Sequence, residues 1–305
     1  MQHNQTPGRF TDGSSWVILS PIELSIKKKV EAIGTPLSEW DVNIYRGVLT
    51  GYNDAFIIPT EKRDEILANC QSESERERTA EIIRPILRGR DIHRYACQWD
   101  NLWIISTFPS KHYDINDYPA IKDYLLTIGM EKLEQTGAEH IVNGRKVKSR
   151  KKTSNKWFET QDSISYWDDL SKPKIIWGEI SDKSKFFLDS NGDYYPEATT
   201  FLLTGEGLPK LLAFLNCKLS EYLFSKIGTT TGVGTVRWKK FKIEQLPIPA
   251  VIDQDKDNAI VCLVEQILKL PNDAQNKIEL EKEIDRLVYQ VYGLNEDEVL
   301  FIENR

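Results

Sequence analysis

Apolar residues recur at intervals of three and four in several stretches of the chain, and this spacing predicts amphipathic helices. In the stretch 211–223, for example, Leu212, Leu215, Leu219 and Tyr222 share one predicted helical face. The same spacing predicts helices over 22–33, 119–133, 260–267 and 280–291. Asn295 and Glu298 have the spacing of a capping box, which predicts a last short helix.

Other apolar runs are too short for helices and predict strands. The sequence 47–59 (GVLTGYNDAFIIP) predicts a strand, a tight turn and a second strand, and 101–108 (NLWIISTF) predicts a buried strand. Asn191 and Gly192 predict a hairpin turn between two further runs. Many short strands and a few helices indicate a mixed α/β (α+β) fold, with a twisted mixed sheet, packed helices and a C-terminal helical element.

The charge of the chain divides it into two predicted parts. The formal net charge is −6 over 305 residues. Residues 253–305 contain 13 acidic and 6 basic side chains, a net of −7, so the remainder carries +1. We therefore predict one domain over 1–252 and a helical element over 253–305, whose amphipathic helices need a partner surface within the domain, on a missing domain or on another subunit.

Composition places the chain among globular proteins, with 40% hydrophobic and 28% charged residues. No window approaches 18 apolar residues, so we expect no membrane span, and no secretory leader is visible. The four cysteines, which are far apart along the chain, suit a reducing compartment, and we expect a cytoplasmic protein. They are Cys70, Cys97, Cys217 and Cys262.

The motifs of the common DNA-modifying reactions are missing from the sequence. It has no Pro-Pro pair of the kind found in the base-holding loop of adenine methyltransferases. No lysine has an acidic residue two positions before it, as many magnesium-dependent nucleases do. Gly232 and Gly234 form a lone G-x-G without the rest of a nucleotide-binding fingerprint. We therefore expect no catalytic residue, metal site or cofactor in this chain, and we interpret it as a chain that binds a partner and does not itself catalyse a reaction.

A cationic segment without any acid, 145–156 (RKVKSRKKTSNK), is the strongest binding signal. A solvated or disordered loop is the plainer interpretation of such a run. Predicted structure brackets the segment and two aromatic residues follow it, so we favour a tethered loop that reaches DNA phosphates. Its seven cations are Arg145, Lys146, Lys148, Arg150, Lys151, Lys152 and Lys156.

A Gly/Thr-rich loop and a strand with cations and aromatic residues form a second candidate DNA-binding segment, 229–240. Here the candidates are Thr229, Thr230, Arg237, Lys239 and Lys240. A further basic set is better suited to positioning DNA, or to surface ion pairs, than to base contact. It comprises Arg84, Arg88, Arg90 and Arg94.

Blocks of the sequence, in the same order, resemble the TaqI-like C-terminal specificity domain of type IIG restriction–modification enzymes and adenine-N6 DNA methyltransferases. The resemblance lies in 47–58 (GVLTGYNDAFII), 83–95 (IRPILRGRDIHRY), 157–159 with 172–176, 215–219 (LNCKL), 246–249 (LPIP) and the tail 283–299. It implies recognition of a short duplex DNA sequence beside methyltransferase and nuclease domains that would lie N-terminal to this chain. S-adenosylmethionine and Mg²⁺ are then expected only for those domains, and the chain is expected to be a C-terminal fragment.

Two other functions remain open from the sequence. The acidic helical tail could make the chain a protein-interaction module that assembles subunits, with a basic segment that is merely solvated. Alternatively, Glu179, Asp182 and Lys183 could belong to the magnesium site of a self-sufficient nuclease, although a solvated turn is the better interpretation of that cluster.

Overall fold

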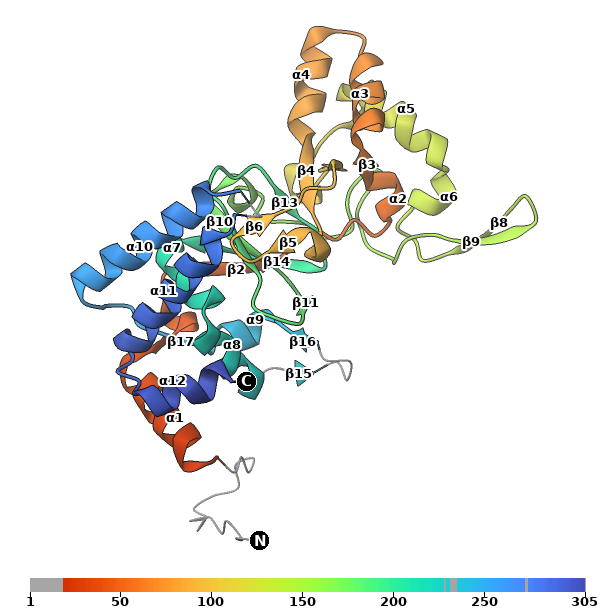
Figure 1. Ribbon diagram of the computed structural model, residues 1–305. Helices are drawn as coiled ribbons and strands as arrows, with labels where there is room; N and C mark the ends of the chain where they lie inside the picture. The colour runs from red at the N-terminus through yellow and green to blue at the C-terminus, as the bar shows by residue number, and fades with distance from the viewer. Residues whose placement is uncertain (1–18, 228, 231–234, 272–273, 305) are drawn as a thin grey trace. The chain divides into compact units, whose positions relative to one another are not determined.

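The computed structural model describes residues 19–227, 229–230, 235–271 and 274–304 (Figure 1). Contacts within the chain divide it into two compact units, and neither is continuous in sequence. Of the described residues, 19–40, 209–227 and 241–304 form one unit, named here the helical unit. Residues 41–208, 229–230 and 235–240 form the other, named the sheet unit. The predicted division into 1–252 and 253–305 stays a prediction.

The helical unit consists mainly of helices, with one pair of very short strands, β1 and β17, that run antiparallel. Its elements are α1 (Pro21–Ile33), β1 (Thr35–Pro36), α7 (Leu208–Asn216), α8 (Lys218–Ile227), α9 (Lys240–Ile243), β17 (Pro247–Ile248), α10 (Gln254–Lys269), α11 (Asn276–Val291) and α12 (Glu296–Glu303).

Local sequence signals explain where these helices begin. Ser20 and Glu23 form a capping box at the start of α1, and Pro21 occupies the first turn, where a missing N–H costs nothing. Asn295 and Glu298 form the predicted capping box of α12. The predictions of helices over 22–33, 260–267 and 280–291 and of the last short helix are confirmed.

The C-terminal helices bury their apolar faces within their own unit. Helix α11 packs on α10 and α8, and α12 packs on α8 and α1. Ile260 and Val264 of α10 and Ile284 and Val288 of α11 are almost completely buried. The partner surface that these amphipathic helices require is therefore supplied, on these faces, by the chain itself.

The prediction of one helix over 211–223 is wrong, because α7 ends at Asn216 and α8 begins at Lys218. Cys217 lies between them, and its Sγ accepts a hydrogen bond from the backbone N–H of Ser220 at 3.4 Å, as an N-cap side chain does. The backbone N–H of Lys218 donates to the carboxylate of Asp285 at 2.8 Å. These polar partners satisfy the N–H groups that a new helix leaves unpaired.

The sheet unit contains short helices and most of the strands. Its helices are α2 (Asn53–Phe56), α3 (Thr60–Ala68), α4 (Glu73–Ile82), α5 (Pro119–Ile128) and α6 (Met130–Leu133). Its strands are β2 (Val42–Arg46), β3 (Ile57–Pro59), β4 (Ile83–Leu87), β5 (Ile92–His93), β6 (Ala96–Cys97), β7 (Leu102–Ile105), β8 (Glu139–Val142), β9 (Arg145–Lys148), β10 (Lys174–Gly178), β11 (Ile180–Ser181), β12 (Phe186–Asp189), β13 (Tyr195–Pro196), β14 (Thr200–Gly205), β15 (Thr229–Thr230) and β16 (Val236–Arg237).

Two four-stranded sheets organise this unit. The first has the order β12-β10-β14-β2 and is antiparallel throughout. The second has the order β13-β4-β7-β3 and is mixed, since β13 runs parallel to β4. Smaller sheets join β11, β16 and β15, pair β5 with β6, and pair β8 with β9. The predicted mixed α/β fold class and the predicted buried strand over 101–108 are confirmed.

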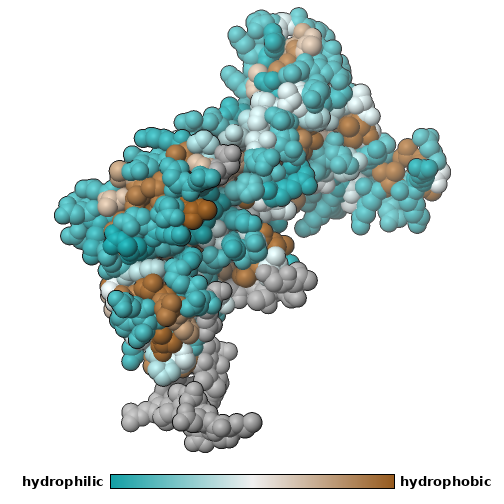
Figure 2. All heavy atoms as spheres, viewed as in Figure 1, coloured by the Kyte–Doolittle hydropathy of each residue, from teal (hydrophilic) through white to brown (hydrophobic). Residues whose placement is uncertain are grey.

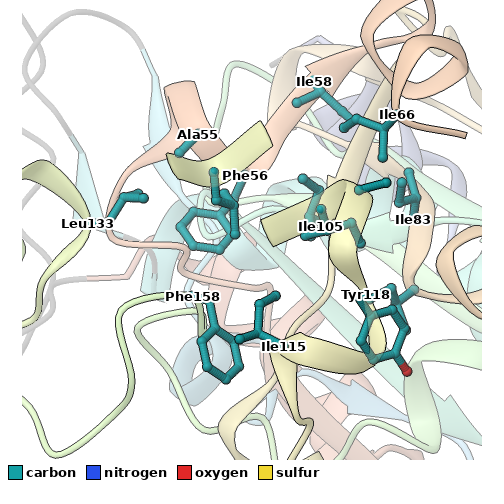
Figure 3. Packing of buried hydrophobic residues seen from close by; sticks show 14 residues of the cluster. Ala55, Phe56, Ile58, Ile66, Ile83, Ile105, Ile115, Tyr118, Leu133 and Phe158 are labelled. Atoms are coloured by element: carbon teal, nitrogen blue, oxygen red, sulfur yellow. The ribbon is translucent and has the colours of Figure 1, made fainter. Parts of the chain in front are cut away.

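A hydrophobic core fills the space between the short helices and the second sheet (Figure 3). Phe56 of α2, Ile83 of β4, Ile105 of β7 and Leu133 of α6 belong to it and are at most 1% exposed. Phe158, which follows the cationic segment, is 4% exposed and packs into the same cluster. The core therefore holds the end of that segment in place.

Three local predictions are wrong in whole or in part. In 47–59 the second predicted strand is present as β3, which pairs with β7, but an isolated bridge at Val48 and the short helix α2 take the place of the first strand and the turn. The predicted helix over 119–133 is divided at Gly129, whose φ of 104° is outside the helical region. The turn at Asn191 and Gly192 joins strands of different sheets, so no hairpin forms there.

The reason for the missing hairpin is a polar cluster at the end of β12. The carboxylate of Asp189 accepts hydrogen bonds from the backbone N–H groups of Asp193 and Tyr194 and pairs with the buried Lys174 at 2.6 Å. These contacts turn the chain away from β12 before the next strand along the chain can pair with it.

No helix in the described parts of the chain is long and apolar enough to cross a membrane.

Candidate nucleic-acid interface

A β-hairpin carries the first part of the predicted DNA-binding segment. Strands β8 and β9 pair antiparallel, with Val142 opposite Arg145 and Glu139 opposite Lys148. Asn143 and Gly144 form the turn with φ of 50° and 74°, as a two-residue hairpin turn of the primed kind requires. Sequence reasoning missed this hairpin although the Asn-Gly signal was present, because the strands on either side are rich in charged residues.

Six of the seven predicted cations in 145–156 have exposed side chains. Among the described residues, only Lys146 of these six lies within 4 Å of a carboxylate, that of Glu139 at 3.8 Å. The Nζ of Lys156 lies 5.4 Å from the centre of the Phe158 ring and 3.4 Å from a backbone carbonyl. The exposed six are Arg145, Lys146, Lys148, Lys151, Lys152 and Lys156.

Arg150, the seventh cation, is buried and has a different environment. Each of its five N–H groups donates to a backbone carbonyl oxygen, at distances of 2.6 to 2.9 Å. Burial lowers the pKa of Arg150 to about 10, against the charge of Glu159, so the guanidinium stays protonated at neutral pH. The phosphate contact predicted for Arg150 stays untested, but its donors are already used by the fold. The accepting residues are Thr50, Leu133, Trp157 and Glu159.

Side-chain hydrogen bonds also hold the loop that follows the hairpin. The Gln135 amide donates to the carbonyl oxygens of Lys156 and Glu159 at 3.1 Å each, and accepts from the Thr153 hydroxyl at 2.8 Å. The Asn155 amide donates to two further backbone carbonyls. The exposed cations are therefore attached to a backbone held at both ends, as expected for a tethered loop.

The residues of the second candidate segment, 229–240, have different environments. Strands β15 and β16 pair, with Thr229 opposite Arg237, whereas residues 228 and 231–234 lie outside the described residues and the side chains of Thr229 and Thr230 are not described. Arg237 is 40% exposed and pairs with Glu179 at 2.9 Å. Lys239 is half-buried, and the Nζ of Lys240 donates to a backbone carbonyl at 2.8 Å.

The prediction of a strand with cations and aromatic residues at the end of this segment is wrong, because β16 ends at Arg237 and helix α9 begins at Lys240. Trp238 lies between them and is 3% exposed, with its ring edge-to-face against Phe186 at 5.7 Å. Its carbonyl oxygen accepts a hydrogen bond from the Trp177 indole N–H at 2.8 Å. Trp238 is therefore a core residue of the sheet unit.

The two candidate segments belong to one unit but to different sheets. Strand β9 packs on β8 and α6, and β16 packs on β11 and β15. In the further basic set, Arg88 pairs with Asp91 and Asp100, Arg84 lies over the Tyr195 ring at 5.6 Å, and Arg90 is 70% exposed. The cations of the 145–156 segment thus stand apart from this set in having few acidic partners.

The nuclease alternative finds no support in the geometry. Glu179 is paired with Arg237, and Asp182 is paired with Lys185 at 2.7 Å, which lowers the pKa of the Asp182 carboxyl. Across the described residues, no group of three or more His, Cys, Asp or Glu side chains is placed to hold a metal ion. Both carboxylates serve as partners of cations.

Comparison with solved structures shows that the fold is one found in restriction–modification enzymes. The type IIL restriction–modification enzyme MmeI, solved in complex with DNA, has a TM-score of 0.56 and 12% identity over 88% of this chain and 36% of that chain. The type IIG restriction endonuclease BpuSI has a TM-score of 0.51 and 14% identity over 89% of this chain and 33% of that one.

The sequence identifies the family. The model of the TaqI-like C-terminal specificity domain matches residues 84–248, and the chain belongs to this family, which confirms the resemblance found in the sequence. It is also 23% identical over 295 residues to the type II methyltransferase M.PaeR7I of Pseudomonas aeruginosa. That alignment covers 95% of this chain and 45% of the relative, so the chain spans about half the length of the curated relative.

Proposed function

We propose that this chain recognises a specific sequence in duplex DNA, as the specificity part of a cytoplasmic restriction–modification enzyme. Adenine methylation and cleavage would be carried out by N-terminal domains of the same polypeptide, which would use S-adenosylmethionine and Mg²⁺. Family membership supports the specificity role. The observation that carries the proposal for DNA is the set of six exposed cations between 145 and 156. The net charge of the chain is −6, so this local concentration of positive charge does not follow from the overall composition.

Cations that already face carboxylates gain little by moving to phosphates, since one ion pair replaces another. Five of these six have no carboxylate within 4 Å among the described residues, so contact with a phosphate would form a new ion pair and release a counterion from DNA. Arg150 anchors the backbone that carries these cations, because its donors bind backbone carbonyls.

The salt dependence of DNA binding tests this proposal. One variant replaces Lys146, Lys148, Lys151 and Lys152 by Gln, and duplex binding by the full chain is measured by fluorescence anisotropy at several salt concentrations. If all four lysines meet phosphates, the slope of log K against log salt becomes shallower by about 3 to 4. The variant is expected to keep its melting temperature, since the four side chains are exposed.

A matched control removes the same charge from the other unit. Lys27, Lys28, Lys269 and Lys282 are also exposed and are changed to Gln together. This control is expected to leave the slope nearly unchanged. Equal effects of the two variants would show that only net charge matters, and failure of the unaltered chain to bind duplex DNA would reject the proposal.

A further inference from the structure

The two faces of the β8–β9 hairpin differ in exposure. On one face His140, Val142 and Val147 are half-buried, whereas Arg145 next to the turn is exposed. The His140 Nε2 lies 4.0 Å from the Glu134 carboxylate of the neighbouring segment. Side chains alternate between faces along a strand, so the opposite face points into solvent. That outer face carries Glu139, Ile141, Lys146 and Lys148, all of which are exposed.

Ile141 is the unusual member of the outer face. Its side chain is 79% exposed, and the register places it directly opposite Lys146, whose side chain is 83% exposed. Figure 2 shows hydrophobic colouring surrounded by hydrophilic residues at this hairpin. An isoleucine on the solvent face of a charged hairpin contributes little burial to the fold, so most of its apolar surface is available to a partner.

The base of the hairpin is held firmly enough to present this face. The backbone N–H of Gly137 donates to the Arg150 carbonyl oxygen at 2.9 Å, and the N–H of Ser149 donates to that of Ala138 at 2.9 Å. The N–H of Arg150 donates to the carbonyl oxygen of Glu134 at 3.0 Å. These bonds extend the ladder into the buried Arg150 cluster, so the ribbon is anchored where it leaves the unit.

A two-stranded ribbon has the width that the major groove of B-DNA admits. In that groove thymine alone among the four bases presents a methyl group, which makes apolar contact with aliphatic side chains. Lysines beside such a contact meet phosphates, or the O6 and N7 acceptors of guanine. The outer face of the hairpin combines these two chemistries.

We propose that the outer face of the β8–β9 hairpin enters the major groove and that Ile141 contacts the 5-methyl group of a thymine. This inference rests on the proposed function, and it adds a base-reading residue to a segment otherwise assigned to phosphates. Lys146 and Lys148 flank the contact and hold the ribbon against the DNA. Glu139 pairs with Lys146 at 3.8 Å, and among the described residues no carboxylate lies within 4 Å of Lys148 or Arg145.

Removal of the thymine methyl group provides the test. A duplex sequence is first enriched from a random pool with the full chain. Each thymine of that sequence is then replaced, one at a time, by deoxyuridine, which lacks only the methyl group. For the unaltered chain, one replacement is expected to weaken binding about fourfold, as one methyl contact would. Ile141→Ala is expected to bind the thymine and uracil duplexes equally, whereas Ile141→Val keeps a difference.

A second exposed apolar residue of the same unit serves as the control. Leu126 of α5 is 43% exposed, and Leu126→Ala is expected to discriminate thymine from uracil as the unaltered chain does. The inference is overturned if the unaltered chain is indifferent to every uracil, or if Ile141→Ala still discriminates. If the unaltered chain enriches no sequence, the proposed function itself fails, and that outcome is distinct from either of the others.

Discussion

The role of Arg150 can be decided by replacing it and measuring stability and DNA binding separately. Arg150→Ala removes five hydrogen bonds at once and leaves the carbonyl oxygens of four residues without these donors. An unsatisfied buried acceptor costs about 1 to 3 kcal/mol. Water that enters the vacated space offsets part of this, so we expect a loss of about 4 kcal/mol in the free energy of unfolding.

Arg150→Lys separates charge from geometry at the same position. The ammonium group keeps the positive charge but has three N–H donors in place of five, so at least two of the five hydrogen bonds are lost. We expect a loss of about 2 kcal/mol, at about 1 kcal/mol for each bond. Urea unfolding at pH 7, followed by far-UV circular dichroism and by tryptophan fluorescence, measures both changes.

Lys151 provides the matched comparison, because it is the next residue and its side chain is exposed. Lys151→Ala is expected to leave stability unchanged within about 0.5 kcal/mol, and to make the salt slope of DNA binding shallower by about 0.9 if it meets a phosphate. Arg150→Lys is expected to leave that slope unchanged. A loss below about 1 kcal/mol for Arg150→Ala, or a shallower slope for Arg150→Lys, would refute the structural role.

Two further predictions concern the stability of each unit. Gly192 and Gly144 share a φ of 74°, but a Cβ at Gly192 would lie 2.1 Å from the Ser171 carbonyl oxygen, whereas nothing lies within 4 Å of a Cβ at Gly144. Gly144→Ala should therefore lower the free energy of unfolding in urea by about 1 kcal/mol, and Gly192→Ala should lower it clearly more. Equal losses would contradict the close approach at Gly192. In the helical unit, a hydrogen bond from Lys226 lowers the pKa of Glu23 from 4.5 to about 2. The ionised carboxylate therefore stabilises the fold fully above pH 4.5, and its contribution to the free energy of unfolding disappears as the pH falls through 2. The stability advantage of the unaltered chain over Glu23→Gln, about 1 kcal/mol at pH 7, should therefore shrink between pH 4.5 and 2, and an advantage that stays constant over this range would contradict the assignment.

The elements that the sequence predicted well have strong local signals. Helices α1 and α12 begin at capping boxes, and the apolar period of α10 and α11 extends over several turns. The errors occurred where distant residues decide the local structure. Asp285, 67 positions away in the chain, accepts from the N–H of Lys218 where α8 begins, and the buried Lys174 pairs with Asp189 where a hairpin was expected.

The candidate interface shows the same division. Charge alone identified the 145–156 segment, because long-range electrostatic attraction depends on composition more than on fold. The hairpin within it was missed, since its charged strands lack the alternation of apolar and polar residues that marks a strand. Ile141 was missed as well, because one isoleucine next to a valine gives no sign of whether it faces the core or the solvent.

By itself, the sequence determined the family, the mixed α/β class, the main helices and the location of the cationic segment, all of which depend on local pattern, motif order or net charge. Only the tertiary structure decided that six of the seven cations face solvent and that Arg150 binds backbone carbonyls. The physical reason is that seven cations close together in sequence look equivalent until the fold buries one of them. Burial depends on residues as distant as Thr50, which is 100 positions from Arg150 and accepts one of its hydrogen bonds.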